Sequence, residues 1–157
     1  MSTETYSPKN MVITVAGQQV TGFGDTDMVT ISLDEAKFVK YVSVDGEVAR
    51  SHNVADTGRF VFTLNQTSSA NELLSGLLVA DTFDASGNLT FPVAIRDENS
   101  NGTFYLGTDC WIEGMPESAF GKEIGTREWV IEAKKIRYSI AGAAAGLLEG
   151  VVEGLIN

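Results

Sequence analysis

Most of the chain alternates apolar and polar residues with a period of two, and this pattern restricts the fold more than any other feature. The clearest case is segment 58–65, in which Phe60, Phe62 and Leu64 share one face and Val61 makes the other face partly apolar. Such alternation is typical of β-strands that line a core. Similar patterns predict further strands over residues 11–15, 29–33, 91–96, 103–112 and 127–138. We therefore expect a small, mostly β domain.

A long hairpin is predicted over residues 38–53, because Asp45-Gly46 separates two alternating segments. Asp-Gly at this position favours a two-residue type I′ turn, in which both central residues need positive φ angles. The hairpin exceeds what a minimal core requires, and a small β domain also leaves strand edges unpaired. We interpret the hairpin as an arm that reaches a neighbouring molecule.

One helix is predicted over residues 69–81. Ser69 and Glu72 have the spacing of a capping box, in which each side chain binds a backbone N–H of the other residue. Leucines at helical spacing follow, and they should pack on a face of the sheet: Leu73, Leu74, Leu77 and Leu78.

Residues 139–157 form a Gly- and Ala-rich extension beyond a β domain of residues 1–138. Its end repeats glycine every four residues, followed by two apolar residues and one polar residue. Each interior glycine costs a helix about 1 kcal/mol relative to alanine, so this segment should form a helix only against a partner. Interspersed glutamates argue against a membrane span. Its apolar stripe supplies candidate contacts between subunits: Leu147, Val151 and Leu155.

The charge balance argues against tight nucleic-acid binding. The chain has 11 basic and 21 acidic residues and a net charge of −10, whereas proteins that bind phosphates tightly cluster Lys and Arg. This acidity suits solubility before assembly, or an acidic inner wall. The polar N-terminus contains no apolar run, which predicts the absence of a signal peptide and folding in a cytoplasm.

Residues suited to catalysis or metal binding are few. Cys110 is the only cysteine and His52 the only histidine. The apolar neighbours of Cys110 favour a buried small side chain over a nucleophile, and one histidine does not complete a common zinc site. Residues 97–102 match the first half of a calcium loop, but its twelfth position is Thr108 instead of glutamate. We expect no enzymatic activity, no cofactor and no metal ion.

Four segments stand out by their order and spacing. They are residues 6–9 (Tyr-Ser-Pro-Lys), residues 45–51 of the hairpin, residues 63–68 with Asn71 and Leu74, and residues 120–124 with Arg127-Glu128-Trp129. Together they resemble the tail tube proteins of contractile-tailed bacteriophages, over about residues 5–135.

The resemblance implies a β-sandwich or barrel with one packed helix, whose subunits form hexameric rings around a continuous inner β-barrel. The rings would stack into a hollow tube that conducts DNA during ejection, with the arm reaching the adjacent ring. Asp25 and Asp27 are candidate acids of the lumen, although turns also recruit Asp for backbone reasons. Candidate residues of the inter-ring arm are Phe38, Val42, Val44, Asp45, Gly46, Glu47, Val48 and Arg50.

The implied partners are further copies of the chain and the tail sheath, tape measure and baseplate proteins, while DNA passes through the lumen without tight binding. The implied location is the virion tail, after assembly in the host cytoplasm. Two alternatives stay open. One is the tube of a type VI secretion or phage-tail-like injection system, and the other is a small β-sandwich binding module.

Overall fold

A computed structural model describes residues 11–23, 28–87, 89–98 and 103–140. Several predicted features lie outside these ranges: the candidate lumen acids Asp25 and Asp27, the candidate contacts Leu147, Val151 and Leu155, and nearly all of the 139–157 extension.

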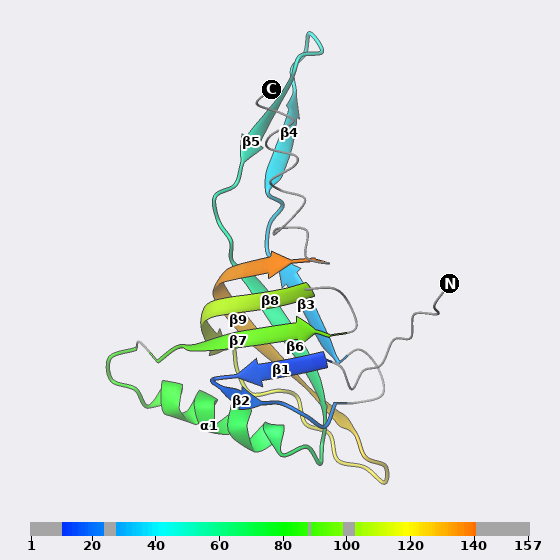
Figure 1. Ribbon diagram of the computed structural model, residues 1–157, viewed down its shortest axis with the longest axis vertical. Helices are drawn as coiled ribbons and strands as arrows, with labels where there is room; N and C mark the ends of the chain where they lie inside the picture. Colours follow the sequence, from blue (N-terminus) through cyan, green and yellow to red (C-terminus); the bar gives the residue numbers. More distant parts are fainter. Residues whose placement is uncertain (1–10, 24–27, 88, 99–102, 141–157) are drawn as a thin grey trace.

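Seven antiparallel strands form one sheet in the order β2-β1-β7-β8-β9-β6-β3. Their bounds are Met11–Val15 (β1), Gln18–Gln19 (β2), Val29–Leu33 (β3), Gly58–Asn65 (β6), Phe91–Asp97 (β7), Thr103–Ile112 (β8) and Thr126–Ser139 (β9). The sheet twists strongly, so that β3 and β6 cross behind β1, β7 and β8 (Figure 1). Helix α1 (Ala70–Thr82) lies at one end of this body. Over the described residues, the predicted mostly β fold with one helix is confirmed.

A second sheet of two strands, β4 (Phe38–Val42) and β5 (Val48–His52), projects from the opposite end of the body as an arm (Figure 1). The predicted hairpin is therefore confirmed. The arm strands pair with each other and belong to a different sheet from the strands of the body.

The core is built from alternate residues of the strands, as the period of two predicts. In β6, Phe60, Phe62 and Leu64 are fully buried, and the predicted face of β9, with Trp129 and Ile131, is buried against them. Full burial stabilises each such side chain by about 1.5–3 kcal/mol. Alternate residues of β1 and β7 and the leucines of α1 join the same cluster.

A close approach explains one glycine of β8. A Cβ atom on Gly107 would lie 2.5 Å from Cε2 of Phe60 and 2.8 Å from Sγ of Cys110. Gly107 and Cys110 are both buried although they are three residues apart, because the alternation of β8 changes phase between them. Asp109 has a positive φ of 51°, and the β7–β8 register shifts at the same level. This bulge brings both residues to the core.

Helix α1 is shifted by one residue from the predicted range, and the predicted capping box is wrong. Ser69 has a helical backbone, with φ −65° and ψ −19°, and makes no side-chain capping bond. Ser68 takes this role instead, because its Oγ accepts a hydrogen bond from the N–H of Ala70 over 3.2 Å. All four predicted leucines pack on the core: Leu73, Leu74, Leu77 and Leu78.

The turn of the arm differs from the predicted type I′ turn. Gly46 has a φ of 93°, whereas Asp45 is not among the residues with positive φ. Three residues, 44–46, form the loop between Ser43 and Glu47, which pair through their backbones. The N–H of Gly46 donates to the carbonyl of Ser43 over 2.9 Å, and the N–H of Ser43 donates to the carbonyl of Glu47 over 2.7 Å. This pattern is a type I turn followed by a glycine bulge.

The extra loop residue shifts the register of the arm by one. A two-residue loop would place Lys40 opposite Ser51, whereas the observed partner of Lys40 is Arg50. Since side chains alternate along a strand, this shift moves one strand's side chains to the other face. The turn with two positive φ angles occurs instead between β1 and β2, at Ala16 (53°) and Gly17 (81°).

Candidate functional site

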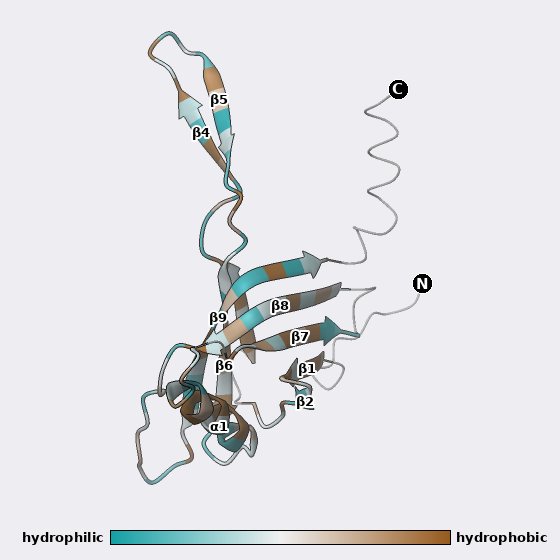
Figure 2. Cartoon of the chain, turned by 90° about the vertical axis from the view of Figure 1, so that its left-hand side faces the viewer, coloured by the Kyte–Doolittle hydropathy of each residue, from teal (hydrophilic) through white to brown (hydrophobic). Residues whose placement is uncertain are grey.

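The arm exposes apolar side chains that the fold does not use. All five residues of each arm strand are exposed, with exposed fractions of 59% at Tyr41, 62% at Val42 and 66% at Val48. Figure 2 shows apolar stretches of the arm standing well away from the body. A hairpin of two strands is marginally stable in water, and exposed apolar surface of this kind marks interaction sites. The arm therefore has the properties of a docking element.

One face of the arm is cationic. It carries three cross-strand pairs: Phe38 with His52, Lys40 with Arg50, and Val42 with Val48. The rings of Phe38 and His52 stack with centroids 5.1 Å apart, and the guanidinium of Arg50 lies 4.3 Å from the centroid of Phe38. Among the described residues, neither Lys40 nor Arg50 has a carboxylate as ion-pair partner. Two like charges thus lie side by side, and the Arg50 guanidinium contacts the aromatic ring of Phe38.

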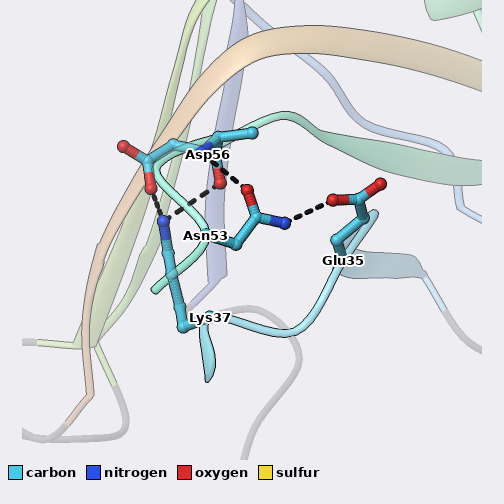
Figure 3. Close-up of polar contacts among 5 residues, drawn as sticks. Glu35, Lys37, Asn53 and Asp56 are labelled. Atoms are coloured by element: carbon cyan, nitrogen blue, oxygen red, sulfur yellow. Dashed lines mark hydrogen bonds and ion pairs between the residues drawn. The ribbon is translucent and has the colours of Figure 1, made fainter. Parts of the chain in front are cut away.

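A polar cluster fixes the base of the arm (Figure 3). The Lys37 ammonium pairs with the Asp56 carboxylate and donates to the carbonyl of Ala55 over 3.1 Å. The Asn53 amide donates to the Glu35 carboxylate, and Oδ1 of Asn53 accepts from the N–H of Ala55 over 3.0 Å. The N–H of Asn53 donates to the carbonyl of Lys37 over 2.7 Å. These bonds join the two strands of the arm where it leaves the body.

The seven-stranded sheet ends in two unequal edges. One edge strand, β2, has only two residues, whereas the other, β3, has five. Within the described ranges, β3 pairs with β6 on one side and has no strand on the other. An unpaired edge of this length can accept a strand from another molecule.

A hollow of about 400 Å³ lies beside the first residues of β9. Its lining combines apolar side chains with three exposed carboxylates: Met115, Pro116 and Val130, with Glu113, Glu117 and Glu128. In the part of the chain that the structure describes, none of these glutamates forms an ion pair. The sequence analysis missed this hollow. The available signal was the run from Glu113 to Glu117, which combines two acids with Met115 and Pro116.

Glu132 of β9 lies within electrostatic reach of Glu113, which lines the hollow, and is paired with Arg59. Burial raises the pKa of Glu132 above its ordinary value, while the guanidinium of Arg59, 3.4 Å from its carboxylate, lowers it. The charges of Asp34 and Glu113 raise the pKa further. The charges of Glu113 and Glu132 are therefore close enough to interact.

Cys110 and His52 do not form a catalytic pair. Cys110 is fully buried in the core, and burial raises its pKa to about 12, whereas His52 lies on the exposed arm against Phe38. Across residues 11–23, 28–87, 89–98 and 103–140, no group of three or more His, Cys, Asp or Glu side chains could hold a metal ion. Residues 99–102 of the predicted calcium loop lie outside these ranges. No helix in the same ranges has the length and apolarity to cross a membrane.

Comparison with known proteins gives a matching family model and a similar phage protein. A family model described as "Bacteriophage PhiTE tail tube protein" matches residues 1–141. The "Structural protein ORF10" of Pseudomonas phage KPP10 is 27% identical over 146 residues, which are 89% of this chain and 84% of that protein.

Similar solved structures come from contractile injection systems. The tube-terminating cap of the anti-feeding prophage has a TM-score of 0.56 at 10% identity, and the match covers 90% of this chain and 95% of that one. The sheath/tube terminator of the extracellular contractile injection system PVC has a TM-score of 0.57 at 10% identity, covering 86% and 96%. A chain of the PVC sheath-tube complex has a TM-score of 0.55 at 11% identity, covering 85% and 90%. At these identities the likeness shows a shared fold alone.

Proposed function

This chain belongs to the Bacteriophage PhiTE tail tube protein family, and from that premise we propose that it is the structural subunit of the tube in a contractile phage tail. Its subunits form hexameric rings around a continuous inner β-barrel. The rings stack into a hollow tube that conducts DNA during ejection. Its role is mechanical, without catalysis or a bound cofactor.

The arm is the observation that carries this proposal. Its exposed apolar strands gain stability only when another molecule covers them. In a stacked tube the adjacent ring is the molecule within reach. The residues proposed for this inter-ring contact are Phe38, Val42, Val44, Asp45, Gly46, Glu47, Val48 and Arg50.

The unequal sheet edges support ring formation. Strand β3 presents a five-residue edge, and pairing with a neighbour in the same ring would continue the sheet from subunit to subunit. Repetition around a closed ring gives an inner barrel whose strands all have partners.

The acidic composition supports the proposed passage of DNA. A net charge of −10 favours repulsion between the tube and a polyanion, so DNA moves without tight binding. Asp25 and Asp27 remain our proposed lumen acids. The proposed outer partners are the tail sheath, with the tape measure and baseplate proteins at assembly, in a tail built in the host cytoplasm.

A second candidate is the tube of a phage-tail-like injection system. The fold is shared with tube and terminator components of two contractile injection systems. Sheath, tape measure and baseplate genes beside this gene would favour the phage tail, whereas effector and immunity genes would favour the injection system.

Negative-stain electron microscopy and solution mass of the purified protein test the proposal. We expect six-fold rings and hollow tubes. A matched variant, in which a short Gly-Ser turn replaces residues 38–52, should form rings that do not stack, because the arm lies outside the core of the body. A compact monomer at every protein concentration would contradict the tube and favour the small binding module.

A further inference from the structure

The cationic face of the arm has no carboxylate partner within the part of the chain that the structure describes. Lys40 and Arg50 are directly opposite each other, and like charges in cross-strand positions destabilise a hairpin. Neither forms an ion pair with a described carboxylate. Carboxylates from outside the arm would remove this repulsion and add attraction.

The hollow beside β9 has the complementary chemistry. Glu113, Glu117 and Glu128 supply negative charge, and Met115 and Val130 supply apolar surface. The arm face combines the opposite charge with exposed apolar side chains of its own, among them Phe38, Val42 and Val48. The two surfaces therefore match in charge and in apolar character.

An arm cannot fill the hollow of its own chain. The arm leaves the body beside Ile136, whose N–H donates to the carbonyl of Asp56 over 3.0 Å. Val130, also in β9, lines the hollow. It lies six residues before Ile136, which is about 20 Å along the strand. The arm then points away from the first residues of β9 (Figure 1). Any contact between arm and hollow must join two copies of the chain.

From these observations we infer that the Lys40–Arg50 face of the arm docks in the Glu113–Glu117–Glu128 hollow of a second copy in the adjacent ring. The inference rests on the proposed tube function and names the acceptor surface of the arm. The contact uses two different surfaces, so each ring offers free arms on one side and free hollows on the other. A contact of this type continues without closing and produces a stack.

Charge reversal on each surface tests the inference. The arm variant carries Lys40→Glu and Arg50→Glu, and the hollow variant carries Glu113→Lys and Glu117→Lys. All four side chains are exposed, so both variants should fold and form rings. In each variant, arm and hollow now have the same sign of charge. We expect the protein concentration needed for stacking to rise at least about tenfold.

Mixing the two variants gives the decisive result. Acidic arms of one variant face basic hollows of the other, and basic arms face acidic hollows. Preformed rings of the two should therefore stack in alternation, although neither stacks alone. A control with Lys122→Glu and Lys134→Glu has the same change in net charge as the arm variant and should stack like the wild type.

The outcomes separate the two proposals. A wild-type protein that forms no rings or tubes overturns both the tube function and the docking. Tubes of the wild type together with equally good tubes of the arm variant overturn the docking alone. The docking is also overturned if the arm variant and the hollow variant fail to stack both separately and when mixed. Neutral variants, Lys40→Gln with Arg50→Gln, should show an intermediate loss, and added salt should weaken wild-type stacking.

Discussion

The indole N–H of Trp129 donates a buried hydrogen bond of 2.9 Å to Oδ1 of Asn71, which joins β9 to the first turn of α1. Nδ2 of the same amide donates to the carbonyl oxygens of Asn65 and Ser68 over 2.9 and 3.1 Å. The Asn71 side chain, on α1, is thus hydrogen-bonded both to β9 and to the turn that precedes the helix.

Asn71→Ala should lower the free energy of unfolding by about 1–3 kcal/mol, because it leaves the buried indole N–H of Trp129 without its acceptor. The carbonyls of Asn65 and Ser68 each lose one of two donors and keep a backbone N–H. Urea unfolding measures this loss. Glu72→Ala, at the exposed neighbouring position, is the control and should change stability by less than about 0.5 kcal/mol. Equal effects of the two substitutions would contradict a structural role for the amide.

Gly46→Val should abolish tube formation without changing the melting temperature of the body. A β-branched residue resists the φ of 93° at this position, whereas the arm contributes nothing to the core. Electron microscopy and thermal unfolding measure the two effects. Gly46→Asn is the matched control and should still form tubes, since asparagine tolerates a positive φ. If the valine variant forms tubes as readily as the asparagine variant, the positive φ of Gly46 is not needed for stacking.

Asn53→Ala should loosen the arm at its base. The substitution removes the bonds to Glu35 and to the N–H of Ala55. Limited digestion with trypsin, which cleaves after Lys40 and Arg50, should become several-fold faster, because the arm opens locally more often. Lys37→Met should act in the same direction, while the stability of the body changes by less than about 1 kcal/mol. Unchanged digestion would show that the cluster does not hold the arm.

Cys110 should make the protein less stable as the pH rises above 9. The folded thiol has a pKa of about 12, against 9.0 for an unperturbed group. The stabilisation that comes from this raised pKa is therefore complete below pH 9. As the pH rises from 9 toward 12, the free energy of unfolding falls by up to about 1.4 kcal/mol per pH unit. Urea unfolding of the wild type and of Cys110→Ala at pH 8 and pH 10.5 measures this effect. The difference in the free energy of unfolding between the two proteins should be smaller at pH 10.5 than at pH 8. A difference independent of pH would indicate that the folded thiol ionises normally.

Truncation after Ser139 should weaken assembly while leaving the subunit folded. The repeat with Leu147, Val151 and Leu155 has the pattern of a segment that needs a partner surface. Solution mass and electron microscopy of the shortened chain test this expectation. Unchanged tubes would show that the extension is dispensable for assembly.

Local patterns were sufficient for the longer strands, whereas the two-residue strand β2 was not predicted. The bounds of β6 and β8 agree with the predicted ranges, because each strand has its own alternation and its own turn signals. The order of the strands depends on pairings distant in sequence, such as β1 with β7 and β6 with β9, which no local pattern contains. The capping box failed because Ser68, which also donates to the carbonyl of Thr21 over 2.6 Å, supplies the capping oxygen.

The candidate site could be predicted only in part. The hairpin was evident from Asp45-Gly46, but the pairing of Lys40 with Arg50 depends on one additional loop residue. That detail decides which charges share a face. The hollow was hidden for a different reason, because Glu128 reaches Glu113 and Glu117 only when β9 folds back beside the end of β8.

The arm strands share no sheet with the body, and none of their residues belongs to the core. Substitutions in the arm should therefore affect the contact with a neighbouring molecule, and should have little effect on the folding of their own chain. Arm and acceptor can exchange charge patterns together over generations while the β domain stays intact.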